Sequence, residues 1–156
     1  QNCDCGRFVE IWNNVFMEYE KQSDGTFKPL AQKNVDTGMG LERITAFIQS
    51  VETLFETDAF QPAIEKIAEL SGKVYDGNER AFRIIADHVR AATFIIGDTN
   101  GVVPSNVGQG YIVRRLLRRA IREGRRLGIK DGFTHLVAEV YVGMYGEHYT
   151  ELETNL

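Results

Sequence analysis

The hydrophobic pattern of this chain changes its period once, at the glycine pair Gly38 and Gly40. Before this pair, the apolar residues form runs rich in Val, Ile, Trp, Phe and Tyr, which are typical of strands. After it, apolar residues recur at the spacing of helices. This division predicts an α+β chain, in which a piece of antiparallel sheet is followed by an all-helical part.

Three strands are expected before or at the glycine pair. Residues 7–20 form a long apolar run, and the turn signal at residues 23–26 predicts a hairpin with a short return strand near residues 27–30. Residues 34–36 are expected to form a third short strand that leads into the glycine turn. Together these strands make up the predicted piece of sheet.

Five helices are expected after the glycine pair. Thr57 and Asp58 favour an N-cap, and Gly72 favours a helix end. One segment, residues 79–97, is apolar on most of its faces, which is typical of a helix at the centre of a bundle. The tail of the chain is polar. The expected helices are residues 40–51, 58–70, 79–97, 110–128 and 133–144.

Positive charge is concentrated in one of these helices. The chain carries a formal charge of −4, but residues 110–130 hold seven Arg and one Lys against the single acid Glu123. A solvated face paired with acidic neighbours would explain such a run. The choice of Arg favours phosphate contacts instead, because guanidinium groups bind phosphate in a bidentate manner. The predicted basic surface consists of Arg114, Arg115, Arg118, Arg119, Arg122, Arg125 and Arg126.

The glycine turn has the chemistry of a nucleotide site. Gly38 and Gly40 let the backbone approach a bulky ligand, and Arg43 offers a planar charged fork suited to phosphate oxygens. Asp36 adds a carboxylate at the mouth of the turn. The pattern is weak by itself, since a plain strand-to-helix turn also explains it.

Two polar residues on the expected preceding strand strengthen this interpretation. Glu10 and Asn13 interrupt an otherwise apolar run, and a buried carboxylate costs free energy unless it binds a cation or donors. Mg²⁺ held by Glu10 and by substrate phosphates would meet that need. Taken alone, Glu10 is better explained as an edge-strand residue that faces water. Together with Asp36 and Arg43, it favours the site.

Two further features have a plainer alternative. Asn106, which follows Pro104 and Ser105, can read a base edge, but a turn residue or helix cap is the simpler explanation. His88, next to Asp87, has no Ser or Cys nucleophile beside it. A buried, hydrogen-bonded histidine is therefore favoured over a catalytic one.

Cysteine usage and hydropathy indicate a cytoplasmic chain. Cys3 and Cys5 are too close to bridge and lack a second ligand pair at zinc-site spacing, so we interpret them as reduced thiols. No signal peptide and no apolar run long enough to span a bilayer is evident, so no membrane partner is expected. The polar turn at Gln1 suggests a piece of a longer protein.

Four segments of the chain resemble the alanyl-tRNA synthetases, a family of class II aminoacyl-tRNA synthetases. The segments occur in the order found in the family. The resemblance implies that residues 1–56 are the C-terminal part of the class II aminoacylation domain, an antiparallel catalytic sheet ending in motif 3. It implies that residues 57–156 begin the all-helical tRNA-recognition region. The segments are EIWNNVFM at 10–17, VDTGMGLERI at 35–44, IADHVRA at 85–91 and PSN…GYIVRRLLRRA at 104–120.

The resemblance also implies roles near the glycine turn. Arg43 would hold an ATP phosphate oxygen in a bent, adenylate-forming pose, and Asp36 would meet the ammonium group of alanine. Gly38 and Gly40 would line the adenylate pocket. The positions that contact the metal and ATP fall on Glu10 and Asn13.

In the helical part, the resemblance implies recognition of the tRNA(Ala) acceptor stem. Asn106 would help to read a G·U wobble pair, and the Arg-rich helix would hold the phosphates beside it. RNA duplexes expose base edges in a shallow minor groove that a loop can reach. The first two class II motifs would precede Gln1, and the zinc ligands of the family would follow Leu156.

The expected activity is therefore that of a parent enzyme. It would condense alanine with ATP, aided by Mg²⁺, and then transfer alanine to tRNA. The isolated fragment is expected to be inactive, because half of its ATP site is absent. The alternative is a non-catalytic RNA-binding module that uses the Arg-rich helix and has a purely structural glycine turn.

Overall fold

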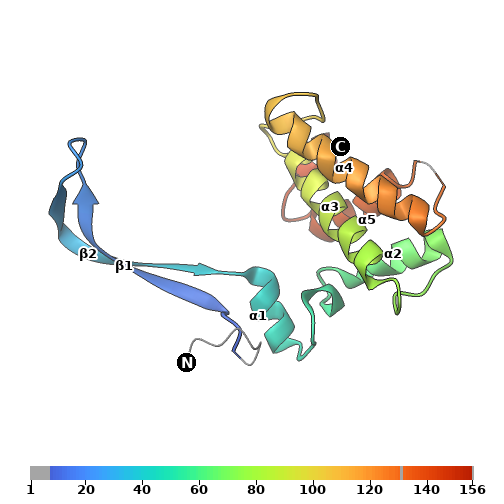
Figure 1. The fold of residues 1–156 in the computed structure, drawn as a ribbon, viewed down its shortest axis with the longest axis horizontal. Coiled ribbons are helices and arrows are strands. Elements are labelled where there is room, and N and C mark those ends of the chain that lie inside the picture. The colour runs from blue at the N-terminus through green and yellow to red at the C-terminus, as the bar shows by residue number, and fades with distance from the viewer. Residues whose placement is uncertain (1–7, 131, 156) are drawn as a thin grey trace. The chain divides into compact units, whose positions relative to one another are not determined.

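The computed structural model describes residues 8–130 and 132–155 of the chain. The chain divides into two compact units, Gln1–Thr57 and Asp58–Leu156. Within the described residues, the first unit holds a two-stranded antiparallel sheet with short helices, and the second holds helices without strands (Figure 1). The chain is thus α+β, as the change of hydrophobic period predicts.

A long two-stranded ribbon dominates the first unit. β1 (Trp12–Lys21) and β2 (Phe27–Met39) run antiparallel. The turn between them is closed by the Asp24 carboxylate, which accepts a hydrogen bond from the backbone N–H of Thr26 at 2.9 Å. The hairpin predicted from the turn signal is confirmed. The first strand begins later than expected: residues 8–11 are not in a strand, β1 starts at Trp12, and residue 7 lies outside the described residues.

The expectation of a third strand is wrong, because residues 34–36 belong to β2. The ladder pairs Met17 with Asn34 and Tyr19 with Pro29, so its register is irregular between these two pairs. Pro29 has no N–H to donate to the ladder, and the extra residues of β2 are accommodated as a bulge at this point. The two short strands expected from the sequence are the two sides of one irregular strand.

The ribbon buries neither of its faces within the described residues. Side chains alternate between the faces along a strand. On one face, Phe16 is 74% exposed and Trp12 is 51% exposed, and on the other face Val15 is 47% exposed. A two-stranded hairpin without a packed face is at best marginally stable in water. Both faces therefore present apolar surface that the described chain does not cover.

A short helix follows the ribbon directly. Gly40 is the N-cap of α1 (Leu41–Ile48), which ends earlier than expected, and η1 (Leu54–Glu56) comes next. Thr57, expected to cap the following helix, is instead buried, and its hydroxyl donates to the Leu54 carbonyl at 2.6 Å. The following helix begins only at Gln61, with Phe60 as its N-cap residue, so Thr57 lies too early in the chain to cap it.

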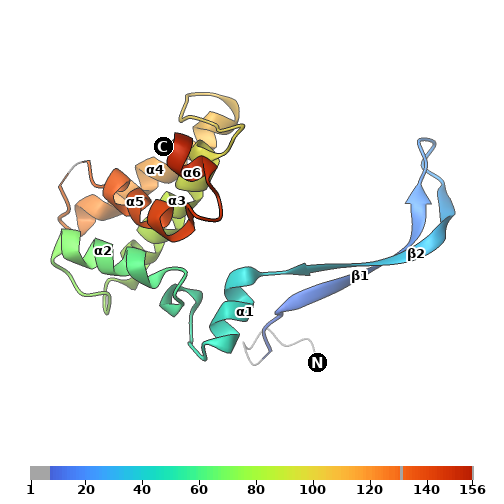
Figure 2. The same cartoon turned by 180° about the vertical axis from the view of Figure 1, so that it is seen from behind.

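The second unit is a bundle built around α3. The other helices of the unit, α2, α4, α5 and α6, all contact α3 (Figures 1 and 2). Phe82, Ile85 and Val89 of α3 are at most 1% exposed. The prediction that this helix is the buried centre of a bundle is confirmed. The helices are α2 (Gln61–Ser71), α3 (Glu79–Gly97), α4 (Gly108–Arg126), α5 (Thr134–Tyr145) and α6 (Glu151–Asn155).

The end of α2 and the presence of α6 show where the sequence pattern predicts the helices correctly and where it does not. α2 starts at Gln61, with a proline in its first turn, and ends as predicted at Gly72, whose φ of +64° suits glycine. The tail read as polar forms α6 instead. Leu152 of α6 is 1% exposed, and the Asn155 amide donates to the Gly97 carbonyl at 3.1 Å. One buried leucine and one hydrogen bond thus anchor a segment with little other apolar character.

The phenol of Tyr141 on α5 is a polar group that the core holds with a hydrogen bond. This side chain is fully buried, and its hydroxyl donates to the Ala86 carbonyl of α3 at 3.0 Å. Burial raises the pKa of Tyr141, so the phenol stays protonated and keeps donating. The hydrogen bond fixes α5 against the central helix.

Tight packing between α4 and the loop before α5 predicts an effect of substitution at Gly124. A Cβ at this position would overlap the Phe133 ring, whereas a Cβ at Gly143 on α5 would meet nothing within 4 Å. We expect Gly124→Ala to lower the free energy of unfolding by about 1–3 kcal/mol, as overpacking does. The matched change Gly143→Ala should raise it by roughly 0.5–1 kcal/mol, since alanine favours helices. Urea unfolding followed by circular dichroism measures both, and equal effects would contradict the packing argument.

Candidate functional site

The glycine turn brings together residues that lie far apart in the sequence. Arg43, in the first turn of α1, donates through Nη1 to the backbone carbonyl of Glu10 at 3.0 Å. Asn13 of β1 stands directly opposite Gly38 of β2 in the ladder. The structure therefore gathers Glu10, Asn13, Gly38 and Arg43 at one end of the ribbon, beside the N-cap residue Gly40.

Asp36 lies on the same face of the ribbon as Asn13 and Gly38. It pairs with Val15, two positions along from the pair formed by Asn13 and Gly38. Paired residues share a face in an antiparallel sheet, and alternate residues return to it. The carboxylate is exposed. Asp36, Asn13 and Gly38 thus share one accessible face.

Neither glycine of the turn is required by its backbone conformation. Only a φ between about +20° and +160° would demand glycine, and neither Gly38 nor Gly40 has a positive φ. A Cβ at Gly38 would meet nothing within 4 Å, and one at Gly40 would only touch the Arg43 side chain at 3.4 Å. The packing of the described chain therefore does not explain the glycines. Their missing side chains leave open surface beside Arg43.

The setting of Glu10 differs from the one expected. It precedes β1 and is exposed, so the argument from burial in a sheet does not hold for the described residues. Its carbonyl, rather than its carboxylate, meets Arg43. In the part of the chain that the structure describes, no group of three or more His, Cys, Asp or Glu side chains forms a metal site. Mg²⁺ held through one exposed carboxylate and substrate phosphates remains compatible with this arrangement.

A second cluster lies in the loop before α4. Arg114 donates through Nη1 to the Asn106 side-chain oxygen, which leaves the amide hydrogens of Asn106 as donors. The loop is closed by the Ser105 N–H, which donates to the Gly110 carbonyl at 3.0 Å, and by the Ser105 hydroxyl, which donates to the Val107 carbonyl at 2.8 Å. Asn106 is exposed on this closed loop. The loop and the basic helix therefore act as one surface.

The arginines of α4 form the outer face of that surface. Val113, Ala120 and Gly124 on the opposite stripe are buried, so α4 is held against the bundle by its apolar side. Arg114 is half-buried, and the remaining predicted arginines are exposed. A groove of about 620 Å³ follows the face, lined by Arg118, Ile121, Arg122, Arg125 and Arg126.

The sequence interpretation counted Glu123 only as a charge and missed its position. It is 1% exposed, although the nearby Arg122, Arg125 and Arg126 are exposed. Burial raises the pKa of Glu123, but hydrogen bonds and charge from Arg122 and Arg126 outweigh it, so the pKa lies below its ordinary value. Two signals could have revealed this: Glu123 lies three residues after Ala120 of the apolar stripe, which places it beside that stripe, and three residues before Arg126.

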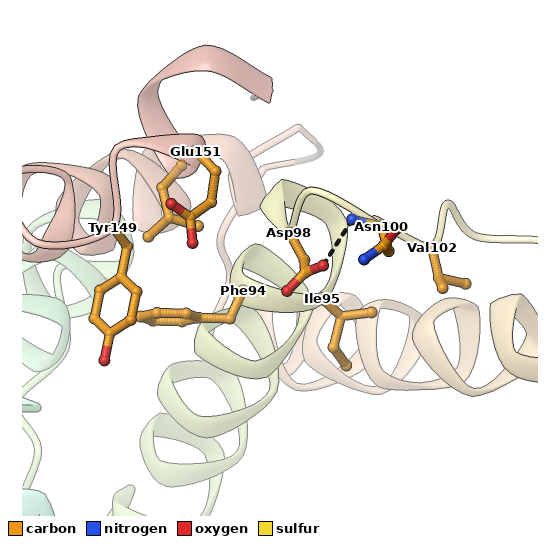
Figure 3. A pocket seen from close by; sticks show the side chains of 8 residues that line it. Phe94, Ile95, Asp98, Asn100, Val102, Tyr149 and Glu151 are labelled. Atoms are coloured by element: carbon orange, nitrogen blue, oxygen red, sulfur yellow. Dashed lines mark hydrogen bonds between the residues drawn. The ribbon is translucent and has the colours of Figure 1, made fainter.

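Two other features of the bundle are not part of these clusters. His88 Nδ1 lies 2.8 Å from the Asp87 carboxylate, so the expected hydrogen bond is confirmed, whereas the His88 side chain is partly rather than fully buried, at 13% exposed. A cavity of about 440 Å³ beside α6 has carboxylates at Asp98 and Glu151, next to the rings of Phe94 and Tyr149 (Figure 3). These carboxylates repel phosphate, which argues against a nucleotide there.

Comparison with known proteins assigns the chain to a family. The whole chain, residues 1–156, matches the profile described as tRNA synthetases class II (A). The chain belongs to this family. The alanine–tRNA ligase of Treponema denticola is 49% identical over 98% of the chain, and that of Elusimicrobium minutum is 47% identical over 98%. The resemblance inferred from the four motifs is confirmed.

The matched region is a minor part of these relatives. It covers 26% of the Treponema protein and 18% of the Elusimicrobium protein. It also covers 26% of the alanine–tRNA ligase of Borrelia garinii subsp. bavariensis, which is 50% identical over 153 residues. The similarity runs through both units, so it includes the glycine turn and the Arg-rich helix alike.

Cys3 and Cys5 lie outside the described residues. Within the described ranges, no helix combines the length and apolar character needed to cross a bilayer.

We expect a side chain at Gly110 to disrupt the closed loop. A Cβ there would overlap the Ser105 hydroxyl and the Val103 carbonyl, so Gly110→Ala should open the hydrogen bonds that hold Asn106. Gly108 has a φ of +56° and open space, and its change to Ala strains only the backbone, by about 1–2 kcal/mol. We expect Gly110→Ala to increase amide hydrogen exchange at Ser105 and Val107. Unchanged exchange at both amides would show that the loop does not depend on this close contact.

Proposed function

We propose that this chain is the part of an alanine–tRNA ligase that joins one wall of the adenylate-forming site to the first tRNA-binding helices. The observation that carries the proposal is the similarity along 98% of the chain to alanine–tRNA ligases. The geometry adds two separate polar surfaces, one at the glycine turn and one on α4. A purely RNA-binding module is less favoured, because it gives the residues of the glycine turn no role.

In the proposed reaction, the alanine carboxylate attacks the α-phosphate of ATP and pyrophosphate leaves. The alanyl group then passes to a hydroxyl of the terminal ribose of tRNA, and AMP leaves. Residues of the glycine turn contribute orientation and charge to the first step. Mg²⁺, when bound, would neutralise charge on the ATP phosphates.

Each residue of the turn has a chemical reason for its proposed role. Arg43 is fixed by a neutral carbonyl, so its guanidinium keeps its full charge for a phosphate oxygen. Asp36 offers an exposed carboxylate to the alanine ammonium group. The open space at Gly38 and Gly40 admits the adenylate. Of the remaining pair, Asn13 contacts ATP, and Glu10 contributes to Mg²⁺ binding.

The helical surface is proposed to bind the tRNA(Ala) acceptor stem. The amide donors of Asn106 can reach acceptors on a G·U pair in the minor groove. Exposed arginines beside it neutralise phosphates, which gives affinity that depends on salt but not on sequence. The phosphate contacts fall on Arg114, Arg115, Arg118, Arg119 and Arg122. We propose that both steps take place in the cytoplasm.

The first test concerns Arg43 in the full-length ligase that contains this segment. Arg43→Ala should lower the rate of ATP–pyrophosphate exchange by roughly 10²–10³-fold, the usual loss for one electrostatic donor at a reacting phosphate or carbonyl. Lys28→Ala removes the same charge from the far end of β2 and should leave exchange unchanged. A normal rate of ATP–pyrophosphate exchange in the Arg43 variant would contradict the assignment of this site.

The second test separates the two surfaces. Asn106→Ala should leave ATP–pyrophosphate exchange intact and lower kcat/KM for charging tRNA(Ala) by roughly 10–100-fold, the discrimination expected of base-edge hydrogen bonds. Asn100→Ala, in the loop that precedes it, is the matched control and should charge normally. A parallel loss of exchange and charging in the Asn106 variant would contradict a role confined to tRNA.

A further inference from the structure

The acid inside the basic face of α4 has an unusual environment. The Glu123 side chain is 2% exposed, whereas the Arg122 and Arg126 side chains that contact it are 59% and 60% exposed. A buried carboxylate is costly unless it is paired and hydrogen-bonded. Here both carboxylate oxygens have partners, so the acid can remain charged under the surface while the arginines reach the solvent.

The contacts of Glu123 fix both guanidinium groups. Arg122 donates to Oε1 through Nε at 3.2 Å and through Nη2 at 2.9 Å. Arg126 donates through Nη1 to Oε2 at 3.1 Å and to Oε1 at 3.4 Å. Glu123 therefore uses only part of each guanidinium. The other N–H groups of Arg122 and Arg126 are not engaged by the acid.

The fixed pair lies along the groove on α4. Arg122 and Arg126 line it together with Arg118 and Arg125. Two guanidinium groups and one carboxylate leave a net local charge of +1, which still attracts an anion. Arginine side chains that are held in place lose less conformational entropy on binding than free ones.

We propose that Glu123 is a positioning residue for RNA binding: its buried carboxylate holds Arg122 and Arg126 so that their remaining donors face a backbone phosphate in the groove. This inference rests on the proposed binding of α4 to RNA. It adds Arg126 to the proposed phosphate contacts and gives a role to the single acid of the basic stretch.

The proposal predicts that removing the charge of Glu123 weakens RNA binding, whereas the change in net charge alone would strengthen it. Glu123→Gln removes a negative charge from a basic face, so charge alone would tighten RNA binding. If Glu123 positions the arginines, the same change weakens binding, because two flexible side chains must then be ordered at the phosphate. Glu139→Gln, at an exposed site on α5, removes an equal charge without touching this pair.

The experiment measures binding of a fluorescently labelled RNA hairpin with a G·U pair in its stem to the full 156-residue chain across a salt series. We expect Glu123→Gln to weaken binding by roughly 3–10-fold, the cost of ordering one or two long side chains. The slope of log K against log salt should also fall by about one phosphate contact. Glu139→Gln should bind as the unaltered chain does.

Two results would overturn these assignments in different ways. Equal or tighter binding by folded Glu123→Gln, with binding by the unaltered chain intact, would overturn the positioning role alone. An unaltered chain that fails to bind the hairpin would overturn the proposed RNA contact, and the positioning role with it.

A second variant decides the question if Glu123→Gln fails to fold by circular dichroism. Arg126→Lys keeps both the net charge and Glu123 but lacks the planar fork that can meet a carboxylate and a phosphate together. It should also weaken binding by roughly 3–10-fold. Unchanged affinity in folded Arg126→Lys would overturn the proposal.

Discussion

The burial of α3 is the constraint on which the helical unit depends. Its apolar side chains are covered by four other helices, and the Tyr141 hydroxyl adds a hydrogen bond to its backbone. Among these contacts, the packing of α4 on α3 matters most for the proposed RNA-binding surface. It presses the apolar stripe of α4 inward and thereby turns the arginines outward. The basic surface is thus a consequence of how the core is filled.

The ribbon of the first unit presents the opposite situation. Large apolar residues are exposed on both of its faces, and its register is irregular near Pro29. The surface that carries Asp36 and Gly38 is consequently shaped by the ladder and by the turn into α1, with no core beneath it in the described chain. The relatives that this chain matches are several times longer than the chain itself.

The sequence predicts the features that a single local signal determines. The apolar helix 79–97 and the end at Gly72 follow from periodicity and from one glycine. The sequence pattern does not predict elements whose structure depends on contacts with distant parts of the chain. The bulge that joins the expected second and third strands depends on pairing with β1, and α6 depends on the burial of Leu152. In the candidate site, motif reasoning gathers Glu10 and Arg43 correctly, yet the contact uses a backbone carbonyl that no side-chain pattern reveals.

Arginine is held by an oxygen in each of the two proposed surfaces, and the nature of that oxygen determines the net charge of the group. Arg43 meets a carbonyl and Arg114 meets an amide oxygen, so both keep a full positive charge. Arg122 and Arg126 share the carboxylate of Glu123, so the three groups together carry a net charge of only +1. A full charge suits a site where negative charge develops on one phosphate during a reaction. A partly neutralised, rigid pair of arginines suits the backbone of an RNA duplex. Its phosphates are regularly spaced, and the RNA must be released after binding.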